Sequence, residues 1–181
     1  ALLNYAYEVM TSAVCAASPE NMKNCAGAAT VIARKAGIFG MVGGQSLDVL
    51  LTDKPVNEKE MEFIFNLKTG ALIEAAFMAG AILAGAGKEC VSQLEKAGNL
   101  VGVAFQIKDD ILDVTSTQEV LGKPVFSDEK NNKTTYVTLY GMEKAAADVE
   151  NMSEKAESIV KSIGDNEFLI ELINKLISRE K

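Results

Sequence analysis

Four polar side chains between residues 105 and 114 have the types and spacing that can do chemistry. In a helix of about 100° per residue, one stripe roughly 100° wide holds Gln106, Asp109, Asp110 and Asp113. Apolar side chains flank this stripe on both sides: Phe105, Ile107, Ile111, Leu112 and Val114. Because a solvated acidic surface would carry more charge beyond the stripe, we expect the three carboxylates to face a cleft.

Three carboxylates on one face repel one another, and their ionised forms are favoured when a cation lies among them. Mg²⁺ suits such a site, because it prefers hard oxygen ligands and shares its other positions with water and phosphate oxygens. The alternative is an ordinary acidic helix surface, which is the commoner origin of an isolated D-D-x-x-D pattern. Here the apolar flanks favour a metal site with Asp109, Asp110 and Asp113 as ligands.

A lysine in apolar surroundings is the second candidate. Lys68 and Thr69 stand between apolar runs within a helix expected over 58–84. A buried ammonium needs an anionic partner; a carboxylate or a phosphate would serve, and the Thr69 hydroxyl adds a donor. The alternative is a side chain that reaches the surface along its apolar stem, which this stretch alone slightly favours.

The glycine-dense stretch 40–50 is the third candidate. Gln45 and Asp48 are three residues apart, so both can lie on one face of a helix and line a cleft. The glycines allow another backbone or a ligand to approach closely. A helix end with polar caps explains the same residues equally well.

Two lysines in the polar loop over 121–136 can reach back towards the acidic stripe. Beside a carboxylate-bound Mg²⁺, Lys123 and Lys133 would hold phosphate as point charges. Considered alone, both are typical of solvated loop lysines.

The composition excludes several classes of function. The chain has 181 residues, 48% hydrophobic and 24% charged, which is typical of one folded domain. A net charge of −7 without a basic stripe argues against a nucleic-acid partner. The absence of histidine excludes imidazole bases and histidine-ligated zinc. Three scattered cysteines form no CxxC pair, so we expect reduced thiols in a cytoplasmic protein.

We also expect no membrane span. No secretory signal peptide opens the sequence. The longest run without a charge, 75–87, is too short and too rich in glycine and alanine to cross a bilayer.

Hydrophobic periodicity predicts an all-α fold, because no stretch alternates as a strand would. Helical spacing extends over 1–10, 20–34, 58–84, 88–115, 142–163 and 165–181. The apolar residues expected to be core in the last of these helices are Phe168, Leu169, Leu172, Ile173, Leu176 and Ile177. The first pattern begins at Ala1 with no cap and a bare apolar face, so we expect a truncated chain.

Four ordered motifs resemble the polyprenyl synthetase family of trans-prenyltransferases. They are GMVGGQSLD over 40–48, KTGAL over 68–72, FQIKDDILD over 105–113, and the GKP, SD and KTTY pieces within 122–136. The resemblance covers the whole chain and is strongest to bacterial short-chain enzymes of the farnesyl diphosphate synthase type. It implies that the chain is part of an isoprenoid synthase helical bundle.

The activity that the resemblance implies is Mg²⁺-dependent head-to-tail condensation of isopentenyl diphosphate with an allylic diphosphate, dimethylallyl or geranyl. The allylic C–O bond ionises, isopentenyl diphosphate attacks the cation, and the departing pyrophosphate takes the proton. Since the leaving group is the base, the reaction needs no histidine. The resemblance also implies a homodimer.

The resemblance carries roles over position by position. The matched metal ligands are Asp109, Asp110 and Asp113 in the second aspartate-rich motif, with the loop acid Asp128. The lysines matched to the allylic diphosphate are Lys68, Lys123 and Lys133. The groups matched to stabilise the allylic cation through their oxygen dipoles are Thr69 and Gln106. Two further positions line the same cavity, Gln45 and Asp48.

The family's first aspartate-rich motif and its isopentenyl diphosphate site lie upstream of Ala1. We therefore expect residues 1–181 to form a single domain, the C-terminal part of a synthase, which is inactive alone. One alternative is a non-catalytic relative that acts as a regulatory subunit, although such a scaffold has no need of three repelling carboxylates. A geranylgeranyl or longer-chain synthase is another alternative. A helical bundle without a ligand would leave Lys68 unexplained.

Overall fold

The computed structural model describes residues 1–115, 134–164 and 166–179, and these residues form helices and no β-strand. The predicted all-α fold is therefore confirmed. In chain order the helices are α1 (Leu2–Ala16), α2 (Met22–Ala36), α3 (Met41–Leu50), α4 (Glu58–Ile64), η1 (Phe65–Gly70), α5 (Ala71–Leu83), α6 (Lys88–Thr115), α9 (Tyr136–Tyr140), α10 (Met142–Ile163) and α11 (Glu167–Ile177).

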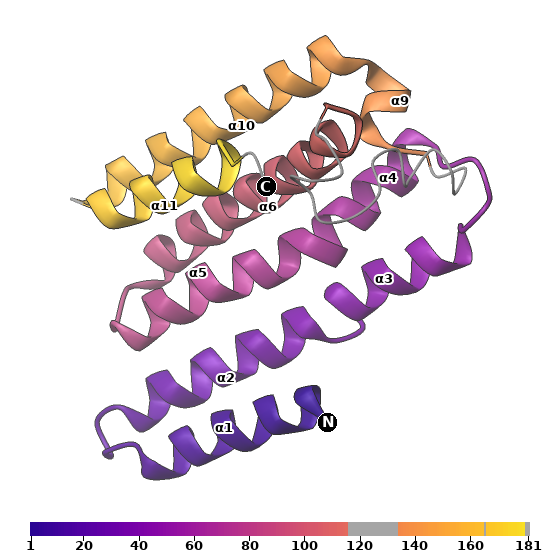
Figure 1. The fold of residues 1–181 in the computed structure, drawn as a ribbon. Helices are drawn as coiled ribbons and strands as arrows, with labels where there is room; N and C mark the ends of the chain where they lie inside the picture. Colours follow the sequence, from indigo (N-terminus) through magenta and orange to yellow (C-terminus); the bar gives the residue numbers. More distant parts are fainter. Residues whose placement is uncertain (116–133, 165, 180–181) are drawn as a thin grey trace.

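Successive helices lie side by side in one row (Figure 1). α3 continues the line of α2, and α4, η1 and α5 run back beside them. α6, the longest helix, packs against α5 on one side and α10 on the other, and α11 folds back onto α10 and α6. α6 is therefore the central element, and its acidic end lies near η1 and α9.

Two hydrophobic clusters join the helices from α3 onwards, and α6 belongs to both. Towards its carboxyl end Ile107 is fully buried among Met61, Ile64 and Phe65 of the neighbouring helix. Towards its amino end Val101 is fully buried against α10 and α11. Apolar packing on both sides fixes the rotation of α6 about its axis, and this rotation decides where the acidic stripe points.

Two details of the predicted helices differ from the structure. The helix expected over 58–84 runs without a break, but its middle is a π-helical segment, η1. In α11, Ile173 is fully buried as expected, whereas Phe168 is 77% exposed and Leu172 is 36% exposed. The prediction that these two residues are core was wrong, because α11 packs against only one side of the row and a narrow stripe of it is covered.

The amino-terminal helix leaves its apolar side chains uncovered. α1 has no buried residue, and Leu2, Leu3, Tyr5 and Val9 are all more than half exposed. The bare apolar face that the sequence predicted is therefore present. Such a surface is typical of an interaction site.

Two helical runs, Met22–Leu50 and Glu58–Leu83, are long and apolar enough to cross a membrane. Length and composition alone are weak evidence, because core helices of soluble proteins pass the same test. Lys68 and Asp48 form an ion pair that joins the two runs across the interior of the bundle. The absence of a membrane span stays a prediction from the sequence.

Glycines let α6 and the neighbouring helix approach until their backbones touch. A Cβ atom built on Gly102 would lie 2.6 Å from the Cα atom of Gly70, and one on Gly98 would lie 2.8 Å from the Cα atom of Glu74. Both distances are shorter than real Cβ contacts, and the obstructing atoms are backbone atoms that cannot swing aside. Only glycine therefore permits this crossing of η1 and α6.

We expect Gly102→Ala to lower the free energy of unfolding by about 1–3 kcal/mol, because the added methyl group forces the two helices apart. Gly80→Ala is the matched control: Gly80 lies in α5 with open space around its Cβ position, so the change should be neutral or stabilise by up to about 1 kcal/mol. Urea unfolding followed by circular dichroism measures both variants. Equal effects of the two substitutions would contradict the close crossing.

Candidate functional site

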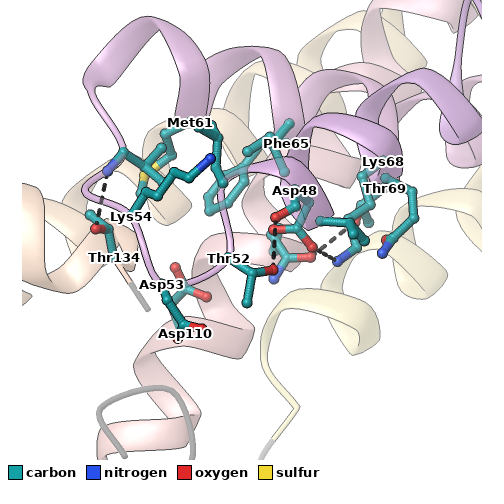
Figure 2. A pocket seen from close by; sticks show the side chains of 16 residues that line it. Asp48, Thr52, Asp53, Lys54, Met61, Phe65, Lys68, Thr69, Asp110 and Thr134 are labelled. Carbon is teal, nitrogen blue, oxygen red and sulfur yellow. Dashed lines mark hydrogen bonds and ion pairs between the residues drawn. The ribbon is translucent and has the colours of Figure 1, made fainter. Parts of the chain in front are cut away.

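Polar residues from three helical elements, α3, η1 and α6, and from two connecting segments meet in a cavity of about 490 Å³ beside the acidic end of α6 (Figure 2). Six of the residues selected from the sequence line it: Gln45, Asp48, Lys68, Thr69, Gln106 and Asp110. Its rim includes Asp53 and Lys54 from the segment after α3, and Thr134 before α9. Residues up to 89 positions apart could not be joined by spacing alone, so their convergence is a finding of the structure.

Lys68 is held by a carboxylate at the wall of this cavity. Its Nζ atom lies 2.5 Å from Oδ2 of Asp48, and both side chains are largely buried, with 32% and 16% exposed (Figure 2). The anionic partner that the sequence predicted for Lys68 is therefore present as a carboxylate. An ammonium has three N–H donors, so the group can bind a second anion while it keeps Asp48.

The π-helical turn directs Lys68 and Thr69 into the same space. Hydrogen bonds in a π-helix join residues five apart, which widens the turn and reduces the angle between successive side chains. Such turns are frequent at functional sites. The Thr69 hydroxyl donates to Oε1 of Gln106 on α6, at 2.9 Å. Close packing holds the turn in place: a Cβ on Gly44 of α3 would lie 2.4 Å from the backbone nitrogen of Lys68.

The three aspartates of α6 lie in different surroundings. Asp110 is 4% exposed, and one of its oxygens accepts a hydrogen bond of 2.7 Å from the backbone N–H of Tyr136, in the first turn of α9. Asp113 is 3% exposed. Asp109 is partly exposed and pairs with the guanidinium of Arg179.

Asp110 and Asp113 are therefore buried, but the Asp109 side chain is 40% exposed, and only Asp110 lines the cavity. Within the described ranges, no three acidic or cysteine side chains lie close enough to hold one metal ion. The metal-ligand role of Asp109, Asp110 and Asp113 stays a prediction. Three further candidates lie outside the described residues: Lys123, Asp128 and Lys133.

Arg179 is a residue that the sequence analysis missed. Its Nη2 atom donates to the Asp109 carboxylate and, at 3.1 Å, to the backbone oxygen of Phe105. The guanidinium carbon lies 3.6 Å from the centre of the Phe105 ring, a cation–π contact. The chain has only two arginines, and their scarcity is the one signal in the sequence that could have drawn attention to Arg179.

A second network behind the cavity also escaped the sequence analysis. Lys35 of α2 pairs with Glu74 of α5 and with Glu95 of α6, and Asn99 donates to Glu74 and to Asn66 of the π turn. Burial acts to lower the pKa of Lys35, but its hydrogen bonds to the two carboxylates outweigh burial and hold that pKa above its ordinary value. The network ties three helices to the turn that carries Lys68.

A set of polar contacts between α9 and α10, the α9–α10 clamp, supports Asp110 through Tyr136. The Tyr136 hydroxyl donates to Asp148 at 2.7 Å, and Lys144 pairs with the same carboxylate. Burial, followed by the Asp148 contact, raises the pKa of Tyr136. Hydrogen bonds from Lys144 and Tyr136 lower the pKa of Asp148. The clamp fixes the residue whose N–H holds Asp110.

Comparisons with known proteins agree with this architecture. A family model described as Polyprenyl synthetase matches residues 1–173. The chain is 37% identical over 155 residues to farnesyl diphosphate synthase of Escherichia coli, covering 83% of this chain and 52% of that protein. It is 39% identical over 127 residues to geranylgeranyl diphosphate synthase of Cyanophora paradoxa, covering 70% and 42%.

Among solved structures, the geranyltransferase of Helicobacter pylori complexed with magnesium and isoprenyl diphosphate superposes with a TM-score of 0.78 at 26% identity. The match covers 97% of this chain and 56% of that one. The chain spans about half the length of the curated relatives it matches.

The α9–α10 clamp predicts a pH dependence. Because the pKa of Asp148 is lower in the folded state, its contribution is complete above its unfolded pKa of about 3.9 and is lost as the pH falls towards the folded value. The difference in unfolding free energy between the unaltered chain and Asp148→Asn should therefore stay constant from about pH 6 to pH 5 and narrow from there towards about pH 3. Urea unfolding across this range measures it.

Glu150→Gln, which changes an exposed acid on the same helix, is the control and should show no such narrowing. A gap for Asp148→Asn that stays constant with pH would contradict the role of the clamp.

Proposed function

We propose that this chain, which belongs to the polyprenyl synthetase family, forms the allylic-diphosphate side of a prenyl diphosphate synthase. The reaction is the condensation of isopentenyl diphosphate with an allylic diphosphate, dimethylallyl or geranyl, and the product is of the farnesyl type. The observation that carries the proposal is the inward-facing Lys68 ammonium beside Thr69, Gln106 and Asp110 in one cavity.

Lys68 binds the diphosphate in this proposal. The ammonium is fixed by Asp48 at 2.5 Å and has further N–H donors for phosphate oxygens. When the allylic C–O bond breaks, negative charge grows on the departing diphosphate, and a cation already in position lowers the barrier without reorganisation. Lys123 and Lys133 extend the same role by family resemblance.

Thr69 and Gln106 face the other product of ionisation, the allylic cation. The Thr69 hydroxyl donates to the Gln106 side-chain oxygen, which leaves lone pairs on both oxygens for an electron-poor carbon. These dipoles are neutral and cannot form a covalent bond to the cation as readily as a carboxylate would. They therefore stabilise the cation until isopentenyl diphosphate attacks it.

The donor set fits Mg²⁺. Asp110 in the cavity, and Asp109 and Asp113 on the same helix, offer hard carboxylate oxygens, and Asp128 joins them by resemblance. When bound, Mg²⁺ supplies positive charge that stabilises the departing diphosphate. Arg179 is paired with Asp109 in the structure. Mg²⁺ must therefore compete with this guanidinium for the Asp109 carboxylate.

The upstream half and the partner are also part of the proposal. The matches cover only about half of each family relative, so we infer that the first aspartate-rich motif comes from the preceding part of the complete protein. The uncovered apolar face of α1 supports the homodimer that the family resemblance implies. A geranylgeranyl-forming enzyme is the alternative product class, since one of the similar relatives bears that name.

Binding of inorganic diphosphate tests the site. In the presence of Mg²⁺, calorimetric titration should show that Lys68→Met weakens diphosphate affinity about ten- to hundredfold, because a charge-assisted contact is lost. Lys68→Arg should retain part of the affinity, and Lys155→Met, an exposed lysine of α10, should retain all of it. Equal affinities for the Lys68→Met and Lys155→Met variants would exclude Lys68 from the site.

Turnover tests the function. The chain alone should form no product from isopentenyl and dimethylallyl diphosphates, because half of the proposed metal site is missing. Addition of an amino-terminal segment that carries the first aspartate-rich motif should restore product formation, measured by chromatography of radiolabelled prenyl alcohols. Robust turnover by the chain alone would refute its expected dependence on the upstream half. A mixture that neither turns over nor binds Mg²⁺-diphosphate would favour the non-catalytic relative.

A further inference from the structure

A second cavity, which the proposed function does not use, lies on the other side of the π turn. Its volume is about 510 Å³, and its walls come from α4, η1, α6, α9 and α10. Met61 and Phe65 line both cavities, so they form the wall between them. A volume of this size falls in the range typical of small-molecule sites, about 300–1,000 Å³.

Three aromatic rings form a continuous surface in this cavity. The ring centres of Phe65 and Tyr136 are 6.1 Å apart with an interplanar angle of 25°, and those of Tyr136 and Tyr140 are 4.6 Å apart at 45°. Leu100, Val103 and Met152 complete the apolar lining. Aromatic faces carry partial negative charge, so this surface suits an apolar group and, at a ring face, a cation.

Acidic side chains stand at one end of the aromatic surface. Glu58 and Glu62 are one turn apart on α4, both are exposed, and both line the cavity. Their charges act on Tyr140: after burial, they are among the causes that raise the pKa of its hydroxyl. Lys59 is the one cation among the described lining residues, so the two carboxylates outnumber the cation in the cavity lining.

One ammonium group of the chain already lies near the Tyr140 ring. Nζ of Lys144 lies 5.3 Å from the ring centre. Lys144 is paired with Asp148 and is not part of the cavity lining. The wall inside the cavity thus offers ring faces and two carboxylates to a cation from outside.

We propose that this second cavity is a binding site for a small amphipathic organic cation, with its ammonium group between Tyr140 and the carboxylates of Glu58 and Glu62. The apolar body of the ligand lies against Phe65 and Tyr136. An anion such as a diphosphate is disfavoured there by the two carboxylates. An occupant would contact Tyr136, whose backbone N–H holds Asp110 in the first cavity.

The test uses two probes that differ only in charge, 3-hydroxyphenyltrimethylammonium and its uncharged isostere 3-tert-butylphenol. The chain labelled with 3-fluorotyrosine has four ¹⁹F reporters: Tyr136 and Tyr140 in the cavity, and Tyr5 and Tyr7 on α1 as internal references. At slightly acidic pH the cationic probe should shift the first pair and leave the second pair unchanged. Its affinity should exceed that of the uncharged isostere about fivefold or more.

Paired substitutions test the role of the Glu58 and Glu62 carboxylates. Glu58→Gln with Glu62→Gln should weaken the cationic probe about tenfold and leave 3-tert-butylphenol unaffected. Glu150→Gln with Glu154→Gln is the matched control, because these exposed acids have the same four-residue spacing on α10, and it should change neither affinity.

Equal affinities for the two probes, shifts that also affect Tyr5 and Tyr7, or a Glu58/Glu62 double variant that binds normally would each overturn the proposal. Tyr136 and Tyr140 signals that move with protein concentration in the absence of a probe would also overturn it, because a second copy of the chain would then cover the cavity. Diphosphate binding is not involved in any of these measurements, so they are independent of the proposed function.

Discussion

The contact between the π turn and α6 is the constraint on which the rest of the structure depends. Gly70 and Gly102 bring the two backbones together, and on either side of this point short side chains can bridge the helices. Thr69 reaches Gln106 on one side, and Asn99 reaches Glu74 on the other. A wider separation would break both bridges, so the packing of two residues without side chains determines the position of the polar groups in the cavity.

Charge placed between closely packed helices has to be compensated, and the protein does this with pairs that each join distant segments. Lys35 joins α2 to α5 and α6, Lys68 joins η1 to α3, and Arg179 joins the end of the chain to α6. Removal of one partner from such a pair costs far more than the pair contributes. These pairs therefore specify one arrangement of the helices, and the candidate site depends on that arrangement.

Periodicity predicted the helices well because the apolar stripes face neighbours on both sides of α6, and the motifs predicted the family that the comparisons then confirmed. The π turn could not be predicted, since the KTG stretch has the composition of an ordinary helix. The partners of Asp109 and Lys35 were also hidden, because Arg179 is 70 residues from Asp109 and Glu74 is 39 residues from Lys35. Burial of Phe168 was predicted wrongly, because a helical pattern shows which face is apolar and not how much of it a neighbour covers.

The stacking of Arg179 on Phe105 ties the segment that follows α11 to α6. Loss of the Arg179 side chain would bare the face of this aromatic ring. The Asp109 carboxylate would lose its counter-charge in the same event. A change at residue 179 alone can therefore leave the helical content of the protein intact and still alter the electrostatics that α6 presents to a ligand.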